Sequence, residues 1–446
     1  MRKKINLILK EVLEKIKPPK EDLNFIETNL NEFLKEIKKR IKKNKLKAEI
    51  FIGGSFAKGT VISKDYYDVD IFMRFDKEYK NISKLTKEIL RGIKNVSIIH
   101  GSRDYFRIKK GPKFFIELVP VKKISKPSQA ENITDLSYSH VNYIKKKIKN
   151  KNILNEIRIA KAFCYATNTY GAESYVNGFS GYGLELLVYY YGSFLKFIKA
   201  ISKEAKKSKK GKNIWNKEYE KKWEEMRKKI IIDIEKYYKN RQMVLFDVNA
   251  SKLNSPIILM DPTYPQRNVL AALSNQTFNN FKKECKKFLK NPSIKSFEKK
   301  EINIEKIREQ AEKKRLEFVL LESKTKKQNG DIAGTKLLKF FKHLEREISR
   351  FFEIKQRGFE YNGKKSATYY FAVESKKEIL TSGPFVKDKK SVKAFRKKHK
   401  KIFTKAKRIY ARDKIDFNLK EFISKWKRKY KKRLKEMSII SLKVKD

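Results

Sequence analysis

The stretch AEIFIGGSFAKGTVISKDYYDVDIFMRF (residues 48–75) constrains the fold more than any other part of the chain. It predicts a short strand over residues 48–52, a glycine-rich turn, and a second strand over residues 68–75. Asp68 and Asp70 are two apart on the second strand, so both carboxylates leave the same face of the sheet while the apolar residues beside them enter the core. The chain must therefore build a sheet that carries two neighbouring carboxylates on one face.

Neighbouring unpaired carboxylates repel each other, which raises a pKa or requires a cation. Magnesium satisfies such a pair with oxygen ligands and keeps coordination positions for substrate phosphates. The alternative for Asp68 and Asp70 is a solvated strand end, and a D-x-D pair standing alone favours that alternative.

The turn before this strand has the composition of a phosphate-binding loop. Gly53 and Gly54 follow a strand directly, where backbone N–H groups can approach a phosphate. Ser55 adds a hydroxyl donor and Lys58 adds positive charge. An ordinary turn is the alternative, and no Gly-Lys-Ser/Thr follows at the spacing of a Walker A loop.

A third carboxylate, Glu117, lies within FFIELVPV, a predicted strand of apolar residues. An unpaired charge is costly in such a place. Glu117 is therefore either paired with a basic group or a metal ligand.

The charge of the chain indicates a polyanionic partner. The 446 residues include 110 Lys and Arg against 51 Asp and Glu, a net charge of +59. Nucleic acid is the leading partner for such an excess. The alternative is an AT-rich genome, which enriches lysine throughout the encoded proteins.

Two cysteines far apart exclude a disulfide framework and a zinc site, and they fit a reducing compartment. The most apolar segment, residues 182–198, contains Glu185 and Lys196 and is short for a bilayer span. We therefore expect a cytoplasmic protein with no membrane partner.

The periodicity of the chain predicts a mixed sheet with flanking helices, then a mainly helical part, then a third part with strands and helices. Expected segments in the helical part include helices over residues 180–200 and 215–240. The segment 203–223 is highly charged and predicts an exposed loop or helix end. The last 60 residues are rich in lysine with interleaved aromatic residues.

A glycine-serine turn after a strand, D-x-D on the next strand and a later strand carboxylate are together typical of the nucleotidyltransferase superfamily that includes polymerase beta. The chain resembles one branch closely, the archaeal-type (class I) CCA-adding enzymes. Four further blocks, in family order, carry the resemblance: TDLSYSHVNYI (134–144), AKAFCYATNTYGAESYVNGFSGYGLELLVYYYGSF (160–194), DPTYPQRNVLAALS (261–274) and TSGPFVKDKKSVKAFRKKH (381–399).

The resemblance implies an α+β multidomain protein. A polymerase-beta-like nucleotidyltransferase head with a mixed sheet and flanking helices would span residues 1–135. A mainly helical nucleotide-recognition neck would span 136–275, and an α/β body with a basic tail that binds tRNA would span 276–446.

The resemblance also implies roles for matching positions. Asp68, Asp70 and Glu117 match catalytic, metal-binding acids, and the implied cofactor is Mg²⁺. The matching nucleotide-binding positions are Ser55, Lys58, His140, Lys161, Tyr170 and Arg267, the last of them implicated in reading the base edge. Without the resemblance, these six residues have ordinary readings as surface, capping or packing residues.

One departure lies inside the opening stretch. The segment between Ser55 and Asp68 is one residue longer than the resemblance leads us to expect, at SKDYYD. Asp65 is therefore a rival for a metal role.

The function implied is template-independent addition and repair of the 3′-terminal CCA of tRNA from CTP and ATP, by two-metal nucleotidyl transfer with release of pyrophosphate. The partners implied are ATP, CTP and tRNA, contacted through its acceptor and TΨC arms and its 3′ end, and a homodimer is left open. The alternatives are a related poly(A) polymerase or oligoadenylate synthetase, and a non-catalytic RNA-binding protein.

Overall fold

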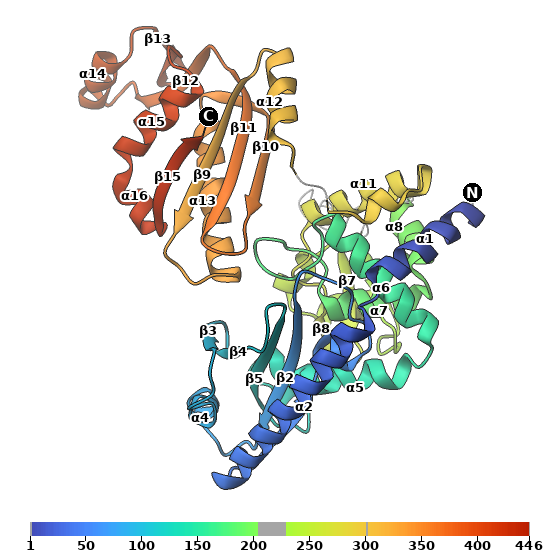
Figure 1. Ribbon diagram of the computed structural model, residues 1–446. Helices are drawn as coiled ribbons and strands as arrows, with labels where there is room; N and C mark the ends of the chain where they lie inside the picture. Colours follow the sequence, from blue (N-terminus) through green and yellow to red (C-terminus); the bar gives the residue numbers. More distant parts are fainter. Residues whose placement is uncertain (1, 204–228, 300–301, 446) are drawn as a thin grey trace. The chain divides into compact units, whose positions relative to one another are not determined.

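The computed structural model describes residues 2–203, 229–299 and 302–445, and the chain divides into two compact units, Met1–Lys300 and Glu301–Asp446 (Figure 1). Most of the charged segment 203–223 lies outside the described residues. Each unit is described by itself.

The first unit begins with a five-stranded mixed sheet, as the sequence predicts. The strand order is β1-β2-β5-β4-β3. The strands are β1 (Ala48–Ile52), β2 (Tyr67–Phe75), β3 (Val96–Ile99), β4 (Tyr105–Lys109) and β5 (Phe114–Lys122). β2 and β5 run parallel and the other neighbours are antiparallel. The two longest strands, which carry the predicted carboxylates, therefore lie side by side.

Two helices border this sheet. They are α2 (Lys20–Lys43) and α4 (Ile82–Ile89). The apolar residues of α2 recur at helical spacing, and Ile26, Phe33 and Ile37 are buried against the sheet. The first helix, α1 (Arg2–Ile16), instead packs on the helical part that follows the sheet.

The helical part has an aromatic core. Its helices are α5 (Ser137–Lys147), α6 (Lys151–Ala166), α7 (Gly181–Tyr191), α8 (Phe194–Ser202) and α11 (Asn275–Lys290). Phe163, Phe197 and Phe281 are fully buried and contact one another or shared aromatic neighbours. Burial of such large side chains is what holds α6, α8 and α11 together.

Two secondary-structure predictions in this part are wrong. The expected helix over 180–200 is two helices, because Gly192 adopts a left-handed φ of 79° and Ser193 caps the next helix. The expected helix over 215–240 falls partly outside the described residues. Its described part, residues 229–240, contains no helix, and Ile230–Ile232 form the short strand β6. Three consecutive isoleucines favour that strand, which pairs with β7.

A small three-stranded sheet, β6-β7-β8, completes the first unit. β7 (Ile257–Asp261) and β8 (Tyr264–Asn268) form a tight antiparallel hairpin, with α10 (Arg241–Asp247) nearby in sequence. This hairpin fixes the positions of Asp261 and Arg267. The short elements of the unit are α3 (Gly54–Ala57) and the 3₁₀ turns η1 (Pro127–Gln129), η2 (Ile133–Leu136), η3 (Ala250–Asn254) and η4 (Ile294–Phe297).

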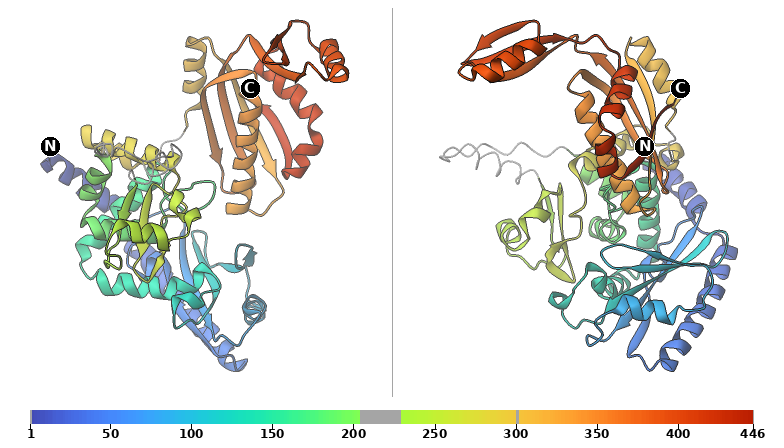
Figure 2. Two further views of the ribbon diagram at one scale, coloured as in Figure 1. Left: turned by 180° about the vertical axis from the view of Figure 1, so that it is seen from behind. Right: turned by 90° about the vertical axis from the view of Figure 1, so that its left-hand side faces the viewer.

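The second unit is a split βαβ arrangement, in which two βαβ halves share one antiparallel sheet of order β10-β11-β9-β15. Its elements are α12 (Ile304–Lys313), β9 (Glu317–Thr325), α13 (Asp331–Ile348), β10 (Phe352–Tyr361), β11 (Ser366–Ser375), α15 (Leu419–Lys429), α16 (Lys431–Glu436) and β15 (Ile439–Lys445). Figure 2 shows α13 lying along one face of this sheet. Phe340 of α13 and Trp426 of α15 share the core with the strands.

The lysine-rich C-terminal region contains an insertion between β11 and α15. It consists of β12 (Glu378–Phe385), α14 (Lys389–Lys398), β13 (Ile402–Lys405) and β14 (Arg408–Lys414), and its three strands form a separate sheet. The backbone N–H of Ile415 donates to the carbonyl of Lys377 at 2.8 Å, so the chain enters and leaves the insertion at one point.

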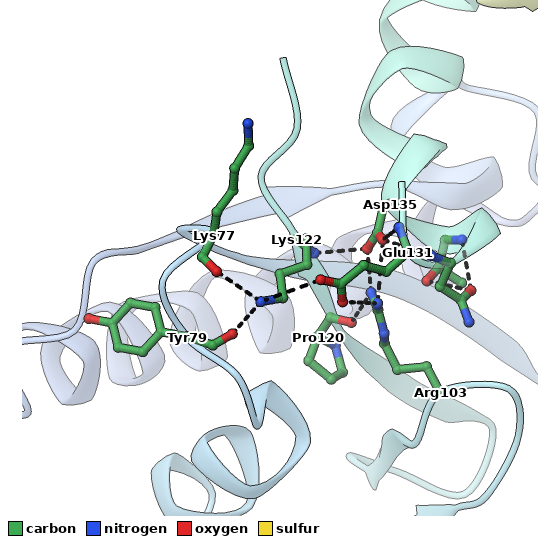
Figure 3. Close-up of polar contacts among 9 residues, drawn as sticks. Lys77, Tyr79, Arg103, Pro120, Lys122, Glu131 and Asp135 are labelled. Atoms are coloured by element: carbon green, nitrogen blue, oxygen red, sulfur yellow. Dashed lines mark hydrogen bonds and ion pairs between the residues drawn. The ribbon is translucent and has the colours of Figure 1, made fainter. Parts of the chain in front are cut away.

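A buried carboxylate anchors the end of β5 (Figure 3). The Asp135 side chain is fully buried and accepts backbone N–H groups of Lys122 at 2.8 Å, Glu131 at 3.0 Å and Asn132 at 2.9 Å. The Arg103 guanidinium also donates to Asp135. These contacts tie the sheet to the turn that leads into the helical part.

We predict that Asp135→Ala lowers the free energy of unfolding by about 3–5 kcal/mol, because the change removes the buried carboxylate that Arg103 and three backbone N–H groups share. Urea denaturation of the whole chain, followed by circular dichroism, measures this loss. Glu131→Ala is the matched control, since the Glu131 side chain pairs with Arg103 at 3.7 Å but is 63% exposed. The control change should cost at most about 1 kcal/mol. Equal effects of the two changes would contradict the anchoring role of Asp135.

Candidate active site

The glycine-serine turn lies directly against Asp70. The backbone N–H of Gly53 donates to the Asp70 carbonyl at 2.8 Å. Gly54 has a φ of 61°, and a Cβ atom there would lie 1.8 Å from an oxygen of the Asp70 carboxylate. Only glycine allows this approach, because any side chain would collide with the carboxylate as well as strain the backbone. The turn is thus shaped around the second aspartate.

The three predicted carboxylates lie on one face of adjacent strands. Asp70 of β2 is in register with Glu117 of β5, and Asp68 precedes Asp70 by two residues. The residues that alternate with them, such as Val69 and Ile116, are buried in the core. Burial, followed by the charges of Glu117 and Asp68, raises the pKa of Asp70 to about 7. The positively charged groups nearby therefore do not fully neutralise the negative charge of this face.

Arg107 partly offsets this charge. It lies on β4 in register with Glu117, and its Nε donates to the Glu117 carboxylate at 2.9 Å, with Nη2 donating to the same oxygen. Sequence reasoning left Glu117 with two readings, a basic partner or a metal, and the basic partner is present in this structure. Arg107 itself was missed, because only the pairing of β4 with β5 brings it there.

A divalent metal fits the remaining pair. In the part of the chain that the structure describes, no set of three or more His, Cys, Asp or Glu side chains converges as metal ligands do. Asp68 and Asp70 nevertheless offer hard oxygen donors on one face, next to a glycine turn, which suits a divalent cation. Both Arg107 bonds go to one oxygen of Glu117, so its second carboxylate oxygen, Oε2, is not engaged by Arg107.

A second buried carboxylate, Glu185, gathers two of the predicted nucleotide-binding residues. It comes from α7 and is fully buried. It accepts Lys58 Nζ at 2.6 Å, Lys161 Nζ at 3.0 Å and Thr60 Oγ1 at 3.0 Å. Lys161 also donates to Thr60 Oγ1 at 2.8 Å. The structure thus brings Lys58 and Lys161 together, although they are far apart in sequence.

This cluster retains one positive charge, because two ammonium groups share one carboxylate. Burial alone would raise the pKa of Glu185, but the ammonium groups of Lys58 and Lys161 outweigh burial and lower that pKa to about 2. Burial, partly countered by Glu185, lowers the pKa of Lys161 to about 8. The carboxylate is therefore ionised at neutral pH, with a net positive charge of one left beside Asp70.

A third buried carboxylate, Asp261 at the end of β7, gathers two more predicted residues. It pairs with His140 Nε2 at 2.9 Å and with Arg267 Nη1 at 2.6 Å, and it accepts Tyr182 Oη at 3.2 Å and Thr263 Oγ1 at 2.8 Å. The His140 and Tyr182 rings stack with centroids 4.2 Å apart. Burial lowers the pKa of His140, so its imidazole is neutral at physiological pH.

The last two predicted residues line a small pocket beside Asp68. Its lining residues are Ser55, Thr60, Val61, Ile62, Lys64, Tyr67, Asp68, Lys161, Tyr165 and Tyr170. Tyr170 stacks on Tyr165 with ring centroids 4.2 Å apart. Asp65, the rival metal ligand, is exposed to solvent and is not among these lining residues.

Sequence reasoning missed both carboxylates that organise the cations. Glu185 served only as evidence against a membrane span, although a carboxylate within the apolar run GYGLELL signals a buried partner. Asp261 follows the apolar run IILM in the same way. Among the described residues, no helix is both long and apolar enough to cross a bilayer.

Two protein families match the first unit. Residues 34–137, which contain the glycine-serine turn and the three carboxylates, match the family described as Nucleotidyltransferase domain. Residues 155–298, which contain Lys161, Glu185 and Asp261, match the family described as tRNA nucleotidyltransferase, second domain.

Curated relatives are CCA-adding enzymes. The chain is 40% identical over 235 residues to that of Nanoarchaeum equitans, a match that covers 52% of each chain and thus about half the relative's length. It is 30% identical over 421 residues to that of Methanocaldococcus jannaschii, covering 91% of this chain and 87% of the relative.

Solved structures share the fold. A cytoplasmic RNA terminal U-transferase gives a TM-score of 0.50 at 12% identity, covering 67% of this chain and 100% of that chain. A poly(U) polymerase bound to MgATP gives a TM-score of 0.50 at 13% identity with the same coverage. With the matched families, this confirms the predicted polymerase-beta-like nucleotidyltransferase fold.

We predict that Glu185→Ala lowers the free energy of unfolding by about 3–5 kcal/mol at neutral pH, because two buried ammonium groups lose their partner. Urea denaturation measures the loss. Glu49→Ala is the control, since Glu49 pairs with Lys123 but is 53% exposed, and it should cost at most about 1 kcal/mol.

The free energy of unfolding lost in Glu185→Ala should also become smaller as the pH falls. Since folding lowers the pKa of Glu185 from 4.5 to about 2, its contribution is present above pH 4.5 and disappears as the pH falls through about 2. The difference between the original chain and the variant should therefore shrink on acidification, and a constant difference would contradict the ion pairs.

Proposed function

This chain belongs to the family of archaeal CCA-adding enzymes and is a nucleotidyltransferase, and we propose that it adds and repairs the 3′-terminal CCA of tRNA. The substrates are CTP, ATP and tRNA, no nucleic-acid template is used, and pyrophosphate leaves. The observation that carries this proposal is the glycine-serine turn closed around Asp70, with Asp68 on the same face and the positively charged lysine cluster behind it.

The reaction needs a divalent metal, and we propose magnesium. Asp68 and Asp70 would hold it, with Glu117 as a third ligand through the carboxylate oxygen that Arg107 does not contact. When bound, the metal lowers the pKa of the attacking 3′-hydroxyl and offsets charge on the leaving pyrophosphate. The chain's own contribution is to fix the carboxylates on two paired strands, so that their geometry is set before substrate arrives.

The proposed nucleotide contacts fall into two groups. Ser55 and the cluster of Lys58 and Lys161 would attract the triphosphate, since this cluster keeps one positive charge. His140 and Arg267, fixed by Asp261, would face the nucleotide from the hairpin side, with Arg267 reading the base edge. Tyr170, stacked on Tyr165, would bound the pocket. A rigid protein surface can thus take the place of a template.

The proposed function also implies a division of labour among the domains of the chain. We propose that the chain is divided into a head (1–135), a neck (136–275) and a body with tail (276–446). The neck and body would hold the acceptor and TΨC arms of tRNA through backbone and shape contacts, which suits a net charge of +59. A homodimer and a cytoplasmic location belong to the same proposal, the latter because both cysteines are free and buried.

The decisive assay uses tRNA ending before CCA, after C and after CC, with CTP, ATP and magnesium. The proposal expects stepwise completion of CCA with release of one pyrophosphate per nucleotide. Long A-tails or 2′–5′ products from ATP alone would instead indicate a poly(A) polymerase or an oligoadenylate synthetase. Binding of tRNA without any pyrophosphate release would indicate a non-catalytic RNA-binding protein.

We predict that Asp70→Ala reduces incorporation of CMP and AMP to background while tRNA binding is largely kept, because the change removes a carboxylate and no tRNA contact. Gel electrophoresis of the extended tRNA and filter binding measure the two quantities. Asp65→Ala is the matched control, since Asp65 is an exposed aspartate of the same segment, and it should retain activity. Full activity of Asp70→Ala would refute the assignment of Asp70 as a metal ligand. Loss of activity in Asp65→Ala would indicate that Asp65 is the metal ligand instead.

We predict that Arg267→Ala damages the choice of nucleotide more than the rate of turnover, because the guanidinium is held by Asp261 at the end of the hairpin. The ratio of CMP to AMP incorporation at the position after CC measures that choice. Unchanged selection between CTP and ATP would refute a role of Arg267 in reading the base.

A further inference from the structure

The pocket beside Asp68 contains a lysine, Lys64, that does not belong to the Glu185 cluster. Two lysines line it, Lys161 and Lys64. Lys161 belongs to the Glu185 cluster, whereas Lys64 lies on the segment that leads from the glycine-serine turn into β2. The question is which ammonium group an incoming anion would meet.

The lysines of the Glu185 cluster are closed off. The side chains of Lys58 and Lys161 are 9% and 4% exposed, and both donate to a fully buried carboxylate. Lys161 donates to three protein acceptors, and Lys58 donates to Glu185 and is nearly buried, so both mainly supply positive potential from behind the pocket. A phosphate that relied on them alone would have to break those bonds.

Lys64 is differently placed. Its side chain is 32% exposed, and its Nζ lies 3.8 Å from Asp68 Oδ1, an ion pair too long for a hydrogen bond. The same ammonium lies 5.0 Å from the centroid of the Tyr165 ring, which stacks on Tyr170. Lys64 also hydrogen-bonds the Tyr165 side chain. Because an ammonium group carries three hydrogens, it can still donate to a third partner in the pocket.

We infer that Lys64 is a further substrate-binding residue, which contacts the triphosphate of the incoming nucleotide in the pocket formed with Ser55 and Asp68. This inference rests on the proposed function, because that function brings a nucleoside triphosphate to the pocket. Lys64 is a suitable contact because a lysine ammonium is a compact charge on a flexible stem and binds phosphate as a point charge.

The charge arrangement supports this role. Asp68 is a proposed metal ligand, so a divalent cation and the Lys64 ammonium compete for the same carboxylate. When the metal takes Asp68, the triphosphate would become the new negatively charged partner of the Lys64 ammonium. The alternative is that Lys64 only neutralises the charge of Asp68. In that case a Lys64 substitution should change the affinity for a ligand with phosphates and for one without phosphates equally.

The test compares the affinity of the intact chain for CTP and for cytidine, which has the same base and sugar but no phosphate. Isothermal titration calorimetry with magnesium present is applied to the original chain, Lys64→Gln and Lys64→Arg. Lys94→Ala, which removes an exposed lysine from the turn before β3, controls for net charge. Melting temperatures show whether each variant is folded.

We expect Lys64→Gln to bind CTP about tenfold more weakly, the size of one charge-assisted contact, and to bind cytidine unchanged. Lys64→Arg should recover most of the CTP affinity, and Lys94→Ala should bind both ligands as the original chain does. The inference is overturned if Lys64→Gln keeps its CTP affinity, if it loses affinity for cytidine equally, or if Lys64→Arg restores nothing.

Failure of the proposed function would look different. In that case the original chain binds CTP but does not extend tRNA, and the comparison between CTP and cytidine still decides the role of Lys64. Conversely, a chain that completes CCA while Lys64→Gln binds CTP normally refutes only the role of Lys64.

Discussion

The candidate active site depends on one constraint, which is that each buried charge must have a partner of opposite charge. Glu185 is fully buried, and an ionised carboxylate in that position is tolerated only because Lys58, Lys161 and Thr60 donate to it. These donors come from the turn after β1 and from α6, whereas Glu185 comes from α7. One set of ion pairs therefore fixes the glycine-serine turn to two helices. Asp261 does the same for His140 and Arg267, so each half of the region is organised around a carboxylate that itself touches no solvent.

The parts of the site that sequence could predict are those set by local spacing. Asp68 and Asp70 share a face because a strand alternates, and the closeness of Gly54 to Asp70 follows from a turn between neighbouring strands. The order of the strands was not predictable in this way. Glu117 was recognised as an exceptional charge, but its register with Asp70 depends on the parallel pairing of β2 with β5, and its pairing with Arg107 depends on the antiparallel pairing of β4 with β5.

The partners of the cations were beyond sequence reasoning because they are distant in the chain. Lys58 and Glu185 are 127 residues apart, and His140 and Asp261 are 121 apart. Nothing in the local pattern distinguishes Lys161 from the many other lysines of this chain. Local pattern also misled at residues 229–240, where a helix is predicted but Ile230–Ile232 form a short strand, because pairing with β7 decided between two states that an isoleucine-rich segment can adopt.

The insertion between β11 and α15 has a consequence for how this protein can change over evolutionary time. The backbone N–H of Ile415 donates to the carbonyl of Lys377, so the two ends of the insertion lie next to each other. The strands of the insertion are not part of the four-stranded sheet. Segments joined in this way can be lengthened, shortened or exchanged as one piece, since no strand of the host sheet has to move. The insertion could therefore change in length without disturbing the pairing of the four-stranded sheet.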